Sequence, residues 1–154
     1  MLSENFSLRE MTRSDVAERR GMLNVPSGLA VENMRRICTD LLEPLRAMLG
    51  TAIIIRSGYR SPDLNRYIGG SPSSQHCRGE AVDLEADGVD TLEVARAIAA
   101  SQLPFDQLIL ECYRAGDPTS GWVHVSLTAS RNRRQVLTAT KRGGAWQYDA
   151  GLPG

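Results

Sequence analysis

A chain of 154 residues is long enough to bury a substantial core as one domain, without help from disulfides or a partner chain. Its 42% hydrophobic and 23% charged residues are typical of a soluble globular protein. The 18 basic and 18 acidic side chains give a formal net charge of zero, and a chain without a basic excess is not expected to bind nucleic acid or a membrane surface.

The sequence gives no sign of a targeting segment or of a disulfide framework. Residues Met1–Phe6 lack a basic region followed by an apolar run, so no signal peptide is predicted, and no apolar stretch reaches the length of a membrane span. Cys38, Cys77 and Cys112 have no paired short spacing, which predicts free thiols rather than a disulfide framework or a zinc knuckle. We expect a monomer made in the cytoplasm, which could act outside it only after export or release.

The first half of the chain is predicted to be mainly helical. Ser14 is a candidate cap for a short helix that ends at Arg20, and 24–28 is a break. The clearest helix covers 28–49, where apolar residues recur at steps of three and four. Pro44 lies inside this helix and should kink or divide it.

Strands are predicted to cluster in the second half. A β-branched run at 53–55 predicts a buried strand, a Gly/Ser-rich loop follows, and Asp90 begins a capping-box pattern for another helix. Further strands are predicted at 80–85, 105–111, 121–127 and 134–140. No structure is assigned from Lys141 onward. The order of elements predicts one α+β domain over 1–154, with a mainly antiparallel central sheet and helices packed on one side.

The two histidines of the chain stand in informative surroundings. His76 leaves the Gly/Ser-rich loop, Gly79 permits a sharp turn, and Asp83 lies in the strand that follows. Strand alternation places His124 on the face opposite Val123 and its apolar neighbours, so it can meet Asp83 if the two strands are adjacent. Two histidines and one carboxylate leave a fourth tetrahedral position for water, as in a catalytic zinc site.

Each of these residues has a simpler interpretation when it is taken alone. A histidine on a strand is usually a hydrogen-bonded, half-buried side chain, and an aspartate near a glycine is usually a turn residue. A spacing of seven residues between His76 and Asp83 is a weak signal by itself. The metal site therefore depends on the wider pattern around both histidines.

That wider pattern resembles the zinc D-alanyl-D-alanine carboxypeptidases, a group that includes the vancomycin-resistance D,D-dipeptidases and phage endolysin L-alanyl-D-glutamate peptidases. The matching segments are Ser57–Ser61, Gly69-Gly70, Ser74–His76, Gly79–Asp83 and Trp122–Ser126. Asn24–Pro26 and Leu42–Arg46 are similar to the short, single-domain members common in phages and prophages. The resemblance implies a hedgehog/D,D-peptidase-like fold and hydrolysis of an amide bond in peptidoglycan stem peptides, by a carboxypeptidase or an endopeptidase.

The resemblance also implies roles for individual residues. His76, Asp83 and His124 match the zinc ligands, so the expected cofactor is Zn²⁺. Arg60 matches an arginine that holds a substrate carboxylate or polarises the scissile carbonyl, although a solvated loop arginine is the alternative. Ser74 matches a serine that can hydrogen-bond substrate.

Trp122 is expected to wall the site, unless its ring serves only for packing.

The general base is the point at which this chain departs from the pattern. Many members carry an acidic residue three positions before the last histidine ligand, where this chain has Gly121. Glu111, at the end of the predicted 105–111 strand, is the expected base. The alternatives are that Glu111 is an ordinary strand-end carboxylate, or that Glu85 or Asp117 is the base. The competing functions are a non-catalytic zinc-binding domain, as in hedgehog-type signalling domains, and a phage structural component.

Overall fold

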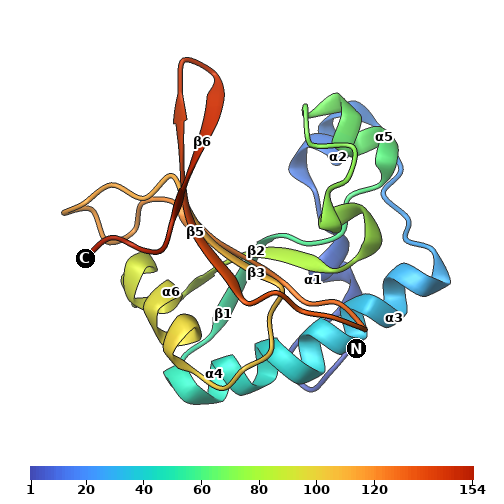
Figure 1. Cartoon of the computed structure of the whole chain (residues 1–154). Helices are drawn as coiled ribbons and strands as arrows, with labels where there is room; N and C mark the ends of the chain where they lie inside the picture. Colours follow the sequence, from blue (N-terminus) through green and yellow to red (C-terminus); the bar gives the residue numbers. More distant parts are fainter.

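The computed structural model describes residues 1–154 and contains a six-stranded sheet with helices gathered mainly beneath it (Figure 1). The strands are β1 (Ile53–Ser57), β2 (Ala81–Ala86), β3 (Gln107–Glu111), β4 (Trp122–Ser126), β5 (Gln135–Arg142) and β6 (Ala145–Ala150). They lie in the order β1-β2-β4-β3-β5-β6, and every neighbouring pair is antiparallel except β3 and β5. The predicted α+β fold with a mainly antiparallel sheet is confirmed.

Most helical elements begin after a serine or aspartate that caps them. The elements are α1 (Leu8–Thr12), α2 (Asp15–Arg20), α3 (Gly28–Ile37), the π-helical turn η1 (Cys38–Leu42), α4 (Glu43–Leu49), α5 (Pro62–Tyr67), the 3₁₀ turn η2 (Gln75–Arg78) and α6 (Thr91–Ala100). Of these, η1 and α4 continue from the helix before them without a side-chain cap. In α1, α2, α3 and α5 a serine hydroxyl accepts a hydrogen bond from the backbone N–H three residues later. The predicted cap at Ser14 is one of these four.

Pro44 interrupts the long helix, as predicted. Proline has no N–H and its ring crowds the carbonyl four residues earlier, so a regular α-helix cannot pass through it without distortion. The chain widens into η1 just before this position, and the N–H of Glu43 donates to the carbonyl of Cys38. This irregular turn lets the consecutive side chains Leu41 and Leu42 both lie in the core.

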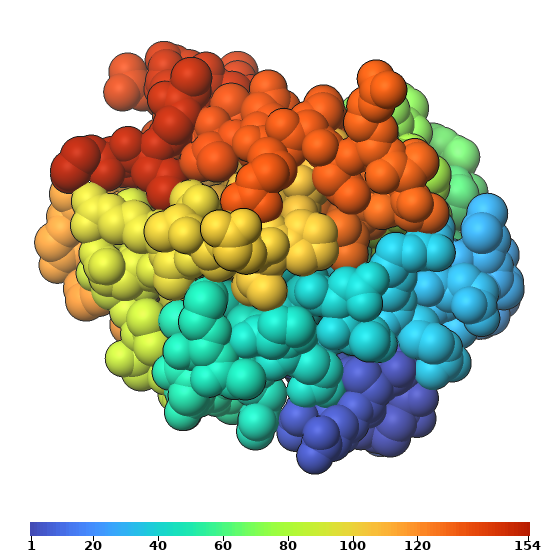
Figure 2. Space-filling view, turned by 60° about the horizontal axis from the view of Figure 1, so that its bottom comes forward, coloured from blue at the N-terminus to red at the C-terminus, as the bar shows by residue number.

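The core lies between the sheet and the layer formed by α3, η1, α4 and α6. Alternate residues of the central strands point into it, including Val82, Leu84, Val123 and Val125. Figure 2 views this helical side, where the α3–α4 segment, in blue to teal, lies beside the yellow segment that follows α6. The residues that alternate with these on the same strands therefore project from the open face of the sheet.

The C-terminal segment from Lys141 onward, for which the sequence predicts no structure, forms part of a β-hairpin. The predicted 134–140 strand extends to Arg142, and Gly143 and Gly144 form the turn that leads into β6. The resulting β5–β6 hairpin rises beyond the rest of the sheet in Figure 1. None of the helices has the length and apolar character needed to cross a membrane.

The three cysteines are free thiols, as predicted. Cys38 is fully buried in the core, and burial raises the pKa of its thiol to about 12.

Candidate metal centre

His76 is held rigidly by the short turn that precedes β2. Ser74 caps η2 by accepting a hydrogen bond from the His76 N–H, and Gly79 ends the turn in the left-handed conformation. A side chain at Gly79 would collide with the backbone carbonyl of Ala30, so this position requires glycine for both reasons. His76 is only 2% exposed.

The imidazole of His76 is oriented by the backbone. Its Nδ1 lies 2.7 Å from the carbonyl oxygen of Gly58, and because a carbonyl can only accept, Nδ1 carries the proton. The unprotonated Nε2 then faces Asp83, 3.4 Å from its Oδ1. Histidine ligands of metals commonly donate their second ring nitrogen to a carbonyl in this way.

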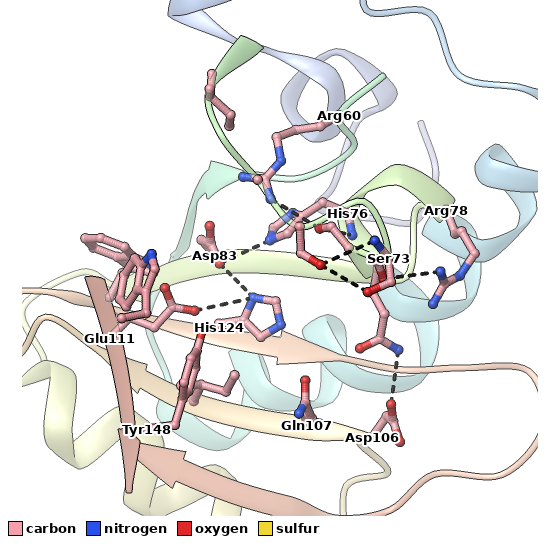
Figure 3. A pocket seen from close by; sticks show the side chains of 18 of the residues that line it. Arg60, Ser73, His76, Arg78, Asp83, Asp106, Gln107, Glu111, His124 and Tyr148 are labelled. Atoms are coloured by element: carbon pink, nitrogen blue, oxygen red, sulfur yellow. Dashed lines mark hydrogen bonds and ion pairs between the residues drawn. The ribbon is translucent and has the colours of Figure 1, made fainter. Parts of the chain in front are cut away.

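Asp83 and His124 are brought together by strand pairing. They are direct partners in the β2–β4 ladder, and Asp83 Oδ1 lies 3.1 Å from His124 Nδ1. One nitrogen or oxygen from each of His76, Asp83 and His124 lies within 4.8 Å of the other two. Figure 3 shows the two imidazoles converging on the Asp83 carboxylate above the sheet.

The charge of Asp83 suits a cation. Burial alone would oppose its ionisation, but the two imidazoles outweigh burial and lower the pKa of the carboxyl well below its usual range. An ionised carboxylate with two imidazole nitrogens is a donor set that zinc accepts while keeping a position free for water. The residues present therefore fit a zinc ion.

Glu111 lies beside this cluster. It ends β3, pairs with Trp122 of β4, and places Oε1 3.7 Å from Nδ1 of His124. Burial, followed by the negative charge of Asp83, raises the pKa of Glu111 to about 7. A carboxyl group with a pKa near neutrality in a groove is well suited to accept and release a proton.

The other carboxylates considered as bases lie elsewhere. Glu85 pairs with Arg56 at 3.6 Å, and Asp117 pairs with Arg114 at 2.6 Å; neither lines the groove that contains the histidines. Gly121 has a φ of 64°, and a side chain there would collide with the carbonyl of Glu111. The backbone therefore excludes an acidic side chain from position 121.

The remaining predicted residues line the same groove, which has a volume of about 800 Å³. Arg60 donates from Nη2 to Ser74 Oγ at 3.3 Å, and its Nε is buried without a hydrogen-bond partner. The guanidinium of Arg56 lies over the ring of Trp122, with its Cζ 5.3 Å from the centroid of that ring. All seven predicted site residues thus border one groove.

Three groove residues from the hairpin were missed by the sequence analysis: Lys141, Trp146 and Tyr148. Tyr148 points toward Glu111 and His124 in Figure 3. A signal was present in the sequence, because Gly143-Gly144 followed by alternating aromatic residues is typical of a hairpin.

Asp106 is a second omission, and it anchors the loop that carries His76. Its carboxylate accepts hydrogen bonds from Nε, Nη2 and the backbone N–H of Arg133, and from Nε2 of Gln75 at 3.1 Å. Gln75 adjoins His76, so this ion pair ties the turn of the candidate metal site to the segment between β4 and β5.

Asp106→Asn is expected to lower the free energy of unfolding at neutral pH by about 2 kcal/mol. Hydrogen bonds from the Arg133 side chain lower the pKa of Asp106 from 3.8 to about 2. Because the folded pKa lies below the unfolded one, the stabilisation is complete above about pH 4 and disappears as the pH falls through about 2. Urea denaturation of both proteins across this range measures the effect. Asp63→Asn is the control, because the ion pair of Asp63 with Arg66 is exposed. If the stability of Asp106→Asn depended on pH in the acid range as much as that of the unmodified chain does, this explanation would be contradicted.

A His-Asp-His cluster, in which His76 is buried and Asp83 and His124 are half-buried, lies beside a carboxylate on the open face of a mainly antiparallel sheet and defines a candidate metallohydrolase site. The sequence model of the Peptidase M15 family matches residues 4–126, so the chain belongs to this family of metallopeptidases, most of which use zinc. The family predicted from the sequence is confirmed. No curated protein matches the chain. The β5–β6 hairpin lies outside the matched residues.

Proposed function

We propose that this chain is a zinc-dependent peptidase that hydrolyses an amide bond in peptidoglycan stem peptides. The observation that carries the proposal is one groove that holds both the His-Asp-His donor set and a carboxylate of near-neutral pKa. Membership of the Peptidase M15 family supports peptidase chemistry. Peptidoglycan is proposed as the substrate because the chain resembles enzymes that act on cell-wall peptides, and the cell wall is the proposed site of action.

His76 Nε2, Asp83 Oδ1 and His124 Nδ1 are the proposed ligand atoms. A zinc ion bound there supplies the Lewis acidity that activates water and polarises an amide carbonyl. Glu111 takes a proton from the attacking water and delivers it to the leaving amine. The C–N bond breaks, and one carboxylate and one amine leave the groove.

Arg60 is proposed to bind an anionic oxygen of the substrate. Its Nε is buried without a partner, and Ser74 accepts from the Nη2 end of the guanidinium. A buried unpartnered donor is costly unless a ligand satisfies it, and a planar guanidinium is suited to a carboxylate or a developing oxyanion. Ser74 is positioned beside Arg60 to hydrogen-bond the same substrate, and Trp122 limits the access of solvent.

The rate of hydrolysis should decrease on the acid side of neutrality. Glu111 acts as a base only when it is ionised, and without metal its pKa is about 7; a bound cation lowers that pKa. We therefore expect kcat/KM to fall by about tenfold per pH unit below a midpoint at or under about pH 7. A pH profile of the zinc-loaded protein tests this, and a rate that stays constant down to about pH 4 would assign the base to another group.

The proposed function is tested by incubating the zinc-loaded protein with purified muropeptides and identifying the products by mass spectrometry. Release of D-alanine would define a carboxypeptidase, and a cut between L-alanine and D-glutamate would define an endopeptidase. Protein treated with a chelator is the control and should regain activity with added zinc. No cleavage of any muropeptide, with zinc bound at one equivalent, would instead favour a non-catalytic zinc-binding domain or phage structural component.

A further inference from the structure

The β5–β6 hairpin presents an aromatic surface that the residues around the metal centre do not explain. Every residue of β6 is exposed, so no side chain of this strand contributes to the core. Trp146 and Tyr148 are nevertheless the two aromatic side chains of the strand, and both border the groove that holds the candidate metal ligands. Exposed aromatic groups at the rim of a groove are typical of a binding surface.

The hairpin fixes the arrangement of this surface. Trp146 and Tyr148 are separated by one residue, so strand alternation places them on the same face of β6. Their rings are stacked with centroids 6.3 Å apart and planes inclined by 28°. Lys141 is the cross-strand partner of Trp146, and its Nζ lies 5.6 Å from the ring centroid. The two rings form one aromatic platform, and the Lys141 ammonium lies over the Trp146 ring.

The platform remains open to a ligand. Trp146 is 40% exposed and Tyr148 is 54% exposed. Most of the remaining groove wall is polar or charged, including Gln107 and Arg131, so it offers no deep apolar pocket for a hydrophobic peptide side chain.

The chemistry of this surface selects among possible ligands. A pyranose ring has a flat face of C–H groups and an edge of hydroxyl groups. Such a ring matches an aromatic plane bordered by hydrogen-bonding side chains, because it buries apolar area while its hydroxyls keep polar partners. An aliphatic peptide side chain has no hydroxyl edge to satisfy the polar wall.

We infer that the β5–β6 hairpin binds the sugar portion of a glycosylated stem peptide, with a pyranose ring lying on Trp146 and Tyr148 while the peptide extends toward His124. The inference rests on the proposed function and deepens it. The substrate is then a peptide still attached to its amino sugar, and the hairpin makes the enzyme prefer it over the free peptide.

Kinetics test this preference with two substrates, a stem peptide and the same peptide linked to a disaccharide of N-acetylglucosamine and N-acetylmuramic acid. The unmodified chain should show a lower KM for the glycosylated peptide, and Trp146→Ala should bring the ratio of the two KM values close to one, a change of about tenfold. Trp146→Phe should restore part of the ratio. Tyr67→Ala, which removes a 51% exposed aromatic ring outside the groove, is the matched control and should keep the ratio.

Binding is tested without catalysis by nuclear magnetic resonance. The chain contains two tryptophans, so it gives two indole N–H signals, and Trp146→Ala assigns them. Titration of the free disaccharide should shift the signal of Trp146 and not that of Trp122 beside the metal centre. Unchanged circular dichroism of Trp146→Ala and Trp146→Phe is the control that both variants keep the fold.

The two proposals fail separately. Equal KM values for both substrates in the unmodified chain, together with an unmoved Trp146 signal, would overturn sugar binding while leaving the peptidase intact. A shifted Trp146 signal without cleavage of either substrate would overturn the peptidase and retain the sugar site. A shift of the Trp122 signal alone would place the sugar at the metal centre and contradict the inference about the hairpin.

Discussion

Glu111→Gln is expected to reduce kcat by about 10²–10⁴-fold while zinc remains bound at one equivalent. The amide has the shape of the carboxyl but cannot accept a proton from water. Glu111 Oε1 is 3.7 Å from His124 Nδ1, whereas the Asp83 oxygen is closer to both histidines, so Glu111 is adjacent to the ligand set without belonging to it. Turnover of a muropeptide and elemental analysis of the same sample separate the two roles.

Asp117→Asn is the matched control for this substitution, since it neutralises a carboxylate that is 41% exposed and outside the groove. Its turnover should equal that of the unmodified chain. If Glu111→Gln lost zinc together with activity, Glu111 would be a ligand rather than a base. If it retained full activity with zinc bound, the base would have to be another group.

Asp83→Asn is expected to remove both zinc binding and hydrolysis. Asp83 Oδ1 is the one oxygen that faces both imidazoles, and the substitution replaces its negative charge with a neutral amide. Zinc at about 100 times its Kd should stabilise the unmodified chain against unfolding by about 2.7 kcal/mol, and this increment should vanish in the variant. Thermal unfolding with and without zinc, combined with elemental analysis, measures it.

Glu85→Gln provides the control on the same strand. Glu85 follows Asp83 by two residues, and its carboxylate pairs with Arg56 away from the groove. This variant should keep the zinc-dependent increase in unfolding temperature and full turnover. A normal zinc response in Asp83→Asn would show that the metal is held by a different set of residues.

The fold was predictable where local chemistry dominates. Serine caps, the apolar period of the long helix and the break at Pro44 are features of short segments, and the structure has all of them. The parallel pairing of β3 with β5 was not predictable, because it joins segments through contacts that no local pattern encodes. The hairpin was predictable only in part: the glycine pair and the alternating aromatic residues indicate a turn and a strand, but an exposed strand has no apolar face that must be buried and so nothing local fixes where it lies.

In the candidate site, too, the residues of one local motif were predictable and those joined by long-range contacts were less so. His76, Gly79 and Asp83 belong to one continuous motif, so their proximity follows from a short turn and the strand that leaves it. The contact of Glu111 with the cluster needed one further assumption, the antiparallel pairing of β3 with β4, which the structure has. The four hydrogen bonds of Asp106 join three separate segments, and nothing in the surrounding residues marks it in advance.

The pairing of Asp83 with His124 across β2 and β4 has a consequence for assembly of the protein. The two residues are 41 positions apart in the chain, and a slip of one residue between these strands would send one of the side chains to the core face. High-affinity metal uptake therefore requires the native register of the two central strands. The appearance of tight zinc binding during refolding would time the moment at which the middle of the sheet closes.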